Sequence, residues 1–337
     1  MRPVTLPFAL AAATLALTAG SRATAPAAGP LTLAPSAGHR IAGIALDREW
    51  LAIAEDPAAA GLCPAVRLVD LTGRRETRTL THASGPTCRL GGRFWVRAGG
   101  RALGVAIVRS IWVTRRGATA IVAKASPGEP EEVLARVTAI DPSRGPFLGP
   151  VVATNWLRLY GHYARAPGGT LTGEVVSANR RALWAAEGPV LPLGLDDEEH
   201  AVTVGSDGAI AMWHAHGARY GRVEAARARA AAVDRGLVAV LRSDRATLDV
   251  RLLNGRRISS WPVASGAAPL LDADGGVAVY LAGRAVHALS LTTGRDRVVA
   301  SAPRGSTLVD AQIERRLIAY AFRGGPAGAG RVVVVAR

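Results

Sequence analysis

The chain has 337 residues, and 49% of them are hydrophobic, which is ample material for a large core. Lysine and arginine outnumber aspartate and glutamate by 41 to 26, so the formal net charge is +15. Beyond the N-terminal segment, no stretch approaches the ~20 apolar residues of a membrane-spanning helix, which argues against a helical membrane protein. The 38 glycines and 20 prolines indicate many turns.

The N-terminal residues resemble a secretory leader. Arg2 precedes an apolar run over residues 6–19, and residues 21–23 (Ser-Arg-Ala) fit a small-x-small cleavage site. We therefore predict a signal peptide over residues 1–23, with an uncleaved N-terminal anchor as the alternative. No cysteine follows the apolar run, which excludes a bacterial lipoprotein. An exported protein is expected, either secreted or held in the cell envelope.

The two cysteines, Cys63 and Cys88, lie at the ends of one short segment. In an exported protein two cysteines favour a disulfide over a metal pair. A bond closing a loop of this length would stabilise the fold by roughly 3 kcal/mol.

A short pattern recurs along the chain. An acidic residue is followed by turn-forming residues and then by a continuous apolar stretch around a central alanine. It occurs at residues 46–55, 206–215, 233–242, 273–282 and 313–322. A continuous apolar run bounded by turns is typical of a strand buried on both faces.

A second pattern follows several of these stretches. An apolar strand ends at a glycine next to an arginine, and a more polar strand then returns; the aligned glycines are Gly73, Gly255 and Gly294. Tight hairpin turns favour glycine because they need a positive φ. Each repeat is therefore predicted to be a meander of four antiparallel strands, which we name a, b, c and d.

Four short strands in a repeat of 40 to 50 residues are typical of a β-propeller. The central residues of the predicted b strands are Ala52, Ala106, Leu159, Ala211, Ala239, Ala278 and Ala319. This predicts an all-β chain with one domain over residues 24–337 and seven blades. The alternative is six, because only 28 residues separate Ala211 from Ala239. Residues 330–337 form a strand c with no following d, so residues 30–37 are expected to supply the outer strand and close the ring.

The first repeat also resembles a known family. Asp47, the strand at residues 50–54 and the Asp-Leu-Thr-Gly at residues 70–73 are similar to the WD40-like repeat of TolB-type propellers. The start of that repeat departs from the family pattern, which has Ser-Pro-Asp-Gly there. The resemblance implies a propeller that binds other molecules, and it implies no catalytic residue because the repeat is structural.

The meander places its loops on two faces. The a–b and c–d turns lie on one face, here called the turn face, and the b–c and d–a loops lie on the other, the loop face. Cys63 falls in the b–c loop of blade 1 and Cys88 in the loop to blade 2. Both cysteines are thus expected on the loop face, where a disulfide could join them.

Two groups of side chains are candidate sites. The segment Asp196–His200 is interpreted as the loop entering blade 4, and His214 and His216 as the end of its strand b, so that all lie on the loop face. Imidazole and carboxylate groups there could bind a divalent metal, although a solvated acidic loop is the simpler interpretation. The metal candidates are His200, His214, His216, Asp196 and Asp197, with Glu198 and Glu199 beside them.

Arginines are predicted to gather on the turn face, where they would attract an anionic partner. The residues proposed for this face are Arg48, Arg74, Arg75, Arg256, Arg257, Arg295, Arg315 and Arg316, with Arg101 and Arg235 in equivalent turns. Arginine-rich turns in a chain that uses almost no lysine are the alternative explanation.

No nucleophile elbow, metalloprotease motif, phosphate-binding loop or Cys-x-x-Cys pair occurs in the sequence. We therefore predict an exported, non-catalytic binding or scaffold module of the cell envelope, monomeric and without a required cofactor. Its partner would be a protein or an anionic envelope polymer rather than nucleic acid. The alternative is a metal-dependent lyase or hydrolase with its site near blade 4.

Overall fold

The computed structural model describes most of the chain from residue 29 onward. It covers residues 29–48, 50–59, 61–62, 65–73, 75–80, 97–98, 106–114, 117–125, 132–139, 147–153, 158–165, 171–177, 182–187, 191–196, 198–205, 207–214, 219–223, 228–244, 246–324, 328 and 330–337. Between residues 75 and 191 it describes the backbone alone. Both cysteines and the predicted signal peptide lie outside the described residues.

The described residues form strands and turns without a helix, and the strands assemble into seven four-stranded antiparallel sheets. The first three sheets contain, in order, β2 (His39–Asp47), β3 (Trp50–Pro57), β4 (Ala65–Asp70) and β5 (Arg75–Leu80); β6 (Arg97–Ala98), β7 (Ala106–Thr114), β8 (Gly117–Ala125) and β9 (Glu132–Ala139); and β10 (Phe147–Ala153), β11 (Arg158–Arg165), β12 (Leu171–Ser177) and β13 (Ala182–Glu187). The next three contain β14 (Leu191–Leu195), β15 (His200–Val204), β16 (Ile210–His214) and β17 (Arg219–Val223); β18 (Ala228–Asp234), β19 (Leu237–Arg242), β20 (Thr247–Leu252) and β21 (Arg257–Pro262); and β22 (Ala267–Asp274), β23 (Val277–Ala282), β24 (Ala285–Ser290) and β25 (Asp296–Ser301). We number these sheets as blades 1 to 6.

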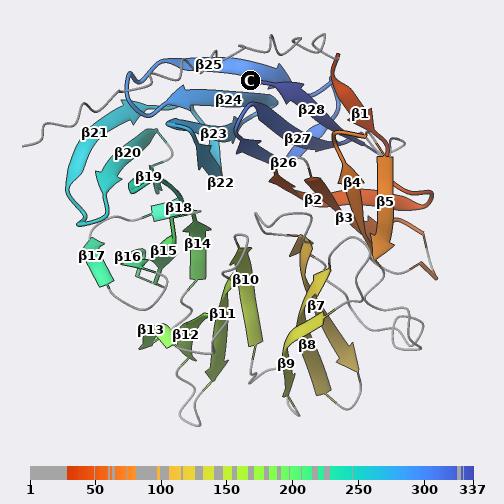
Figure 1. The fold of residues 1–337 in the computed structure, drawn as a ribbon, viewed down its shortest axis with the longest axis horizontal. Coiled ribbons are helices and arrows are strands. Elements are labelled where there is room, and N and C mark those ends of the chain that lie inside the picture. Colours follow the sequence, from red (N-terminus) through yellow and green to blue (C-terminus); the bar gives the residue numbers. More distant parts are fainter. Residues whose placement is uncertain are drawn as a thin grey trace, which may run out of the picture.

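Blade 7 combines the two ends of the described chain. It consists of β26 (Thr307–Glu314), β27 (Leu317–Arg323), β28 (Arg331–Ala336) and β1 (Leu31–Leu33), and β1 pairs antiparallel with β28. The predicted closure of the ring by an N-terminal strand is confirmed. The blades surround a common centre, with the a strands innermost and the d strands outermost (Figure 1).

The core lies between neighbouring blades, because the central strands are buried on both faces. In blade 1, Ile41, Ile44, Leu51 and Ile53 are fully buried and pack with residues of β27 and β28 from blade 7. Equivalent clusters join blades 4 and 5, 5 and 6, and 6 and 7. Each such side chain contributes about 1.5–3 kcal/mol, so the continuous apolar runs of the b strands hold the ring together.

A buried ion pair secures the closing strand. Arg67 Nη2 lies 2.8 Å from Glu55 Oε1, and the side chain of Glu55 is fully buried. The same two groups reach the segment after β1, because Arg67 Nη2 donates to Ala34 O at 2.6 Å and Ser36 N donates to Glu55 Oε1 at 3.0 Å. Blade 1 therefore anchors the strand that completes blade 7.

A polar network crosses blade 6. The Tyr280 hydroxyl donates to Asp296 Oδ2 at 2.5 Å and accepts from the N–H of Ala264 at 3.0 Å. His287 stacks on the Tyr280 ring and lies 3.1 Å from the same Asp296 oxygen. The network links strands b, c and d of the blade to the loop that enters it.

The assignment of blade 4 from sequence was wrong. Residues 210–214 were predicted as its strand b, but they form β16, which is strand c, and strand b is β15. The Asp-Gly at residues 207–208 lies in the b–c loop rather than in an a–b turn. Ala211 and Ala239 are therefore not equivalent, which explains their close spacing without a compressed blade.

No helix long and apolar enough to cross a membrane occurs in the part of the chain that the structure describes.

Candidate functional site

The inner strands of blades 1, 5, 6 and 7 end in acidic residues at the turn face. Asp234, Asp274 and Glu314 each occupy the last position of a strand a. The next residue has a left-handed backbone at Arg235 (φ 48°), Gly275 (φ 57°) and Arg315 (φ 52°). Two-residue hairpin turns require this geometry, which glycine adopts more easily than arginine. Blade 1 repeats the arrangement with Arg48 (φ 50°) after Asp47.

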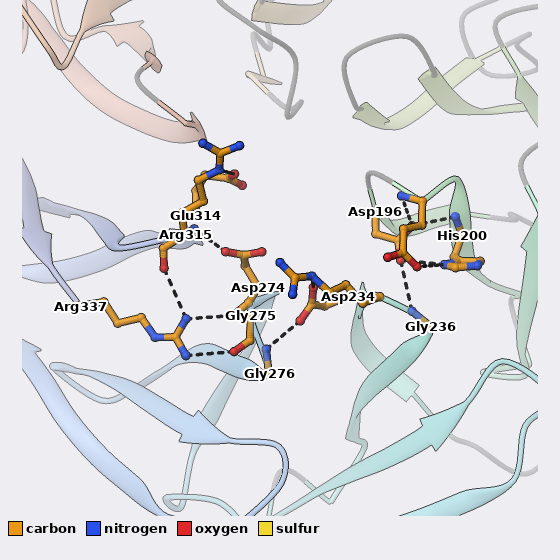
Figure 2. Close-up of polar contacts among 12 residues, drawn as sticks. Asp196, His200, Asp234, Gly236, Asp274, Gly275, Gly276, Glu314, Arg315 and Arg337 are labelled. Atoms are coloured by element: carbon orange, nitrogen blue, oxygen red, sulfur yellow. Dashed lines mark hydrogen bonds and ion pairs between the residues drawn. The ribbon is translucent and has the colours of Figure 1, made fainter. Parts of the chain in front are cut away.

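Two of these carboxylates, those of Asp234 and Asp274, contact the next blade. Asp234 Oδ2 accepts a hydrogen bond from Gly276 N at 2.8 Å, and Asp274 Oδ2 accepts one from Arg315 N. Asp196 Oδ2 lies 3.4 Å from Gly236 N in the same relation. Figure 2 shows these contacts following one another around the centre. Hydrogen bonds to these acidic residues thus connect blades 4, 5, 6 and 7 at the turn face.

Polar side chains of the inner strands make further contacts between blades. Asp272 Oδ2 accepts from Ile313 N at 2.8 Å, and Asp310 Oδ2 accepts from Ile44 N at 3.0 Å. Each inner strand is the edge of its sheet, so the N–H groups on its unpaired side have no neighbouring strand to bond to. Blade 6 thus supplies an acceptor to blade 7, and blade 7 supplies one to blade 1 across the closure of the ring.

The C-terminal arginine joins this arrangement. Arg337 Nη2 donates to Gly275 O at 3.1 Å, and its Nη1 lies 3.4 Å from Arg315 O (Figure 2). A Cβ atom at Gly275 would meet Arg337 Nη1 at 2.9 Å, so glycine leaves room for the guanidinium group. Arg337 therefore bridges the a–b turns of blades 6 and 7.

A cavity of about 150 Å³ opens among these turns. Five carboxylates and two guanidinium groups line it, namely Asp196, Glu198, Asp234, Asp274, Glu314, Arg235 and Arg315. Asp196, Asp234 and Glu314 are buried, whereas Arg235 and Arg315 are 73% and 62% exposed. The cavity, which we call the mouth, is therefore acidic within and bordered by arginine. Sequence analysis did not identify it, although the acidic residues recur with the repeat.

The structure brings three of the predicted metal candidates, Asp196, His200 and His214, to one end of blade 4. His200 and His214 face each other across β15 and β16. Because β15 is strand b, this end belongs to the turn face, so the predicted location on the loop face was wrong. Asp197 and His216 lie outside the described residues.

The Asp196 carboxylate accepts hydrogen bonds from backbone N–H groups of its own turn. Asp196 Oδ1 accepts the N–H groups of Glu198 and His200 at 3.0 and 2.8 Å, and Asp196 Oδ2 lies 2.9 Å from His200 Nδ1. His214 Nε2 lies 3.7 Å from Glu199 Oε2. Among the residues that the structure describes, no group of three or more histidine, cysteine or acidic side chains is arranged to hold a metal ion.

The predicted arginines fall on the turn face where the structure describes them. Arg48, Arg315 and Arg316 lie in a–b turns, and Arg256 and Arg295 lie in c–d turns. Arg257 begins the strand after its c–d turn. All of these except Arg48, which is partly buried, are exposed. Arg74 and Arg101 lie outside the described residues, and of Arg75 only the backbone is described.

The sequence matches no protein-family model and no curated protein sequence. Solved structures do resemble this chain. The β-propeller domain of the trilobed protease from Pyrococcus furiosus is 9% identical with a TM-score of 0.59, and the match covers 90% of this chain and 94% of that one. KlHsv2 with loop 6CD replaced by a Gly-Ser linker is 9% identical with a TM-score of 0.54, covering 84% and 89%. A chain of the mitotic checkpoint complex is 12% identical with a TM-score of 0.54, covering 100% and 99%.

The fold is therefore that of a WD40-like β-propeller, as the sequence predicts.

Proposed function

We propose that this protein is an exported, non-catalytic binding module of the cell envelope whose turn face binds an anionic partner. The observation that carries the proposal is the row of exposed arginines on one face of blades 5, 6 and 7. Its members are Arg235, Arg256, Arg257, Arg295, Arg315 and Arg316. Guanidinium groups suit carboxylate and phosphate partners because they donate paired hydrogen bonds.

The ion pairs that these arginines form on the surface are long. Arg235 Nε lies 3.9 Å from Asp234, Arg257 Nη1 lies 3.9 Å from Asp249, and Arg315 Nε lies 3.8 Å from Glu314. The carboxylates are buried, but the guanidinium groups of Arg235, Arg257 and Arg315 are 73%, 53% and 62% exposed to water. At these distances the two groups do not form a hydrogen bond, so each contact is weak. An anionic partner could therefore engage the guanidinium groups without breaking a strong internal contact.

Charge is arranged radially on the turn face, with carboxylates in the mouth and arginines in the surrounding turns. An anionic partner is repelled by the mouth and attracted by the turns further out. We therefore expect the partner to contact the c–d turns of blades 5 and 6, where Arg256, Arg257 and Arg295 lie, rather than the mouth.

The experiment compares two double charge reversals that change the net charge equally. Arg256→Glu/Arg257→Glu alters the turn face, whereas Arg284→Glu/Arg304→Glu alters exposed arginines in a b–c turn and a d–a loop on the loop face. Binding of poly-L-glutamate and of polyphosphate is measured by fluorescence anisotropy between about 0.02 and 0.3 M salt.

We expect salt-sensitive binding that the turn-face reversal weakens by roughly tenfold or more, while the loop-face reversal has a much smaller effect. Equal losses in both variants would mean that only net charge matters, and absent binding at low salt would refute the proposal. Export is tested separately, by N-terminal sequencing of the protein recovered from the culture medium and the cell envelope.

A further inference from the structure

The outer strands carry a one-residue irregularity that the central strands lack. In blades 1 to 6 the ladder between strands c and d shifts by one residue, whereas the b–c ladders run without a shift. The residues left without an opposite partner are Thr77, Leu134, Leu183, Tyr220, Ile258 and Val299. Such β-bulges twist a sheet edge and re-aim side chains.

In blades 4, 5 and 6 the bulged segment exposes a large apolar side chain. Tyr220 is 42% exposed, Ile258 is 47% exposed, and Val298, next to the bulge residue of blade 6, is 56% exposed. Only Leu62 joins them as an exposed large hydrophobic residue within the described part of the chain. Blades 4, 5 and 6 therefore each expose a large apolar side chain at or beside the bulge in their strand d.

An arginine precedes each of these apolar residues. Arg219, Arg257 and Arg297 are all exposed, and Arg256 and Arg295 lie in the adjoining turns. Each apolar residue lies within the first three positions of its strand, and so close to the c–d turn. The strands β17, β21 and β25 are the outermost of their blades (Figure 1). Their basic and apolar residues near the c–d turns thus form a rim along the turn face. We call these residues the rim.

We propose that the rim binds the surface of an anionic lipid bilayer. Its apolar side chains would enter the interface between headgroups and acyl chains, and its arginines would bind lipid phosphates. Basic residues combined with exposed apolar side chains are the composition that anionic membrane surfaces attract. The inference rests on the proposed anionic partner and names its chemical class.

The arrangement of the rim favours a bilayer over other occupants. The apolar side chains come one from each blade, so they do not form the continuous buried centre of a protein interface. A fluid, extended surface can contact all three at once. Addition of a peptide strand to β21 or β25 is disfavoured, because the bulges interrupt the flat edge that a new strand needs.

The experiment uses vesicles of phosphatidylcholine alone and vesicles in which about a quarter of the lipid is phosphatidylglycerol, an anionic lipid. Cosedimentation measures binding of the unaltered protein, of Tyr220→Ser/Ile258→Ser/Val298→Ser, and of Leu62→Ser. Leu62→Ser is the control, because it removes an exposed apolar side chain from the b–c loop of blade 1, on the loop face. Circular dichroism and thermal unfolding verify that each variant is folded.

We expect binding to the anionic vesicles alone, a loss of roughly tenfold or more in the triple variant, and no change in Leu62→Ser. Binding of poly-L-glutamate should be unaffected by the triple substitution, since the arginines remain. Polyglutamate binding without vesicle binding, or vesicle binding that ignores the triple substitution, would overturn the membrane inference and leave the proposed function standing. If the unaltered protein does not bind poly-L-glutamate at all, the proposed function itself is refuted.

Discussion

The carboxylate of Asp234 accepts a hydrogen bond from the backbone N–H of Gly276, which lies 42 residues later in the sequence and one blade further round the ring. The two groups are 2.8 Å apart, and Asp234 is almost completely buried. Contacts of this kind connect successive turns without help from the outer strands, so blade packing and the shape of the mouth depend on the same side chains.

Replacement of Asp234 by alanine should therefore destabilise the protein. The partly buried N–H of Gly276 would lose its acceptor, which costs up to about 1–3 kcal/mol. Urea unfolding measures the change. Asp234→Asn, which keeps an acceptor oxygen, should lose less, and Asp244→Ala, at an exposed turn, should be close to neutral. Equal losses in Asp234→Ala and Asp244→Ala would contradict the role given to the contact between blades.

A second prediction concerns Gly294, in the c–d turn of blade 6. Its φ is 71°, and a Cβ atom there would lie 2.2 Å from the Trp261 ring of blade 5. Gly294→Ala therefore combines backbone strain with a clash, whereas Gly266→Ala, at φ 74° with nothing within 4 Å, has the strain alone. Strain should cost roughly 1–2 kcal/mol, and we expect a clearly larger loss at Gly294. Thermal unfolding of the two variants decides whether the outer contact between blades is tight.

The ion pair between Glu55 and Arg67 allows a third test. Arg67→Met leaves a buried carboxylate without its partner, which should cost about 3–5 kcal/mol. The double variant Glu55→Leu/Arg67→Met should recover most of that loss, because a buried pair replaced by apolar side chains is often neutral. Both variants lose the contact of Arg67 with Ala34 O, and the double variant also loses the contact of Glu55 with Ser36 N. Amide hydrogen exchange at residues 31–33 should therefore accelerate in each variant, and more in the double variant. Unchanged exchange in the double variant would show that the pair does not anchor β1.

Tyr280 makes the stability of blade 6 sensitive to alkaline pH. Burial raises the pKa of its phenol well above the ordinary value of 10.0, and the hydrogen bond to Asp296 raises this pKa further, while the contact with the N–H of Ala264 opposes both. Above about pH 10 the unfolded phenol loses its proton while the folded one keeps it, so the unfolded state binds fewer protons and stability falls as pH rises.

Tyr280→Phe should flatten this fall above about pH 10, relative to the unaltered protein. Urea unfolding at a series of pH values measures the slope, and absorbance near 295 nm counts the tyrosines that ionise before unfolding. Identical slopes in the unaltered protein and in Tyr280→Phe would contradict the argument.

The predicted metal site makes a fifth prediction. Because the Asp196 carboxylate already accepts hydrogen bonds from its own turn, we expect His214→Ala to leave the metal content of the purified protein unchanged. Elemental analysis before and after the substitution measures this. Stoichiometric zinc or another divalent metal that disappears in His214→Ala would support the alternative of a metal-dependent enzyme.

The repeat pattern was sufficient to predict the propeller and its closing strand, because both depend on local features. The b strands are continuous apolar runs between turns, and residues 30–37 were predicted to supply the outer strand of the last blade, where β1 (Leu31–Leu33) pairs with β28. Blade 4 was assigned wrongly because β15 and β16 are both buried along their centres. A single sequence therefore does not distinguish strand b from strand c when an Asp-Gly turn precedes the second of them.

The mouth could not be predicted in the same way. It depends on which carboxylate faces which N–H group in the neighbouring blade, as Asp274 faces Arg315, and strand patterns do not specify that geometry. The recurrence of an acidic residue at about every 40 positions was the available signal, but it was interpreted as turn chemistry alone. The arginines, by contrast, lie in turns whose face follows directly from counting strand crossings.

The pairing of β1 with β28 also sets an order of events during synthesis. Residues 31–33 are synthesised about 300 residues before residues 331–336, so β1 must wait for β28 before blade 7 can form. Throughout that interval the nascent chain has an incomplete circle with two uncovered sheet surfaces. Damage to β1 or β28 would leave those apolar surfaces uncovered, and exposed surfaces of this kind favour aggregation.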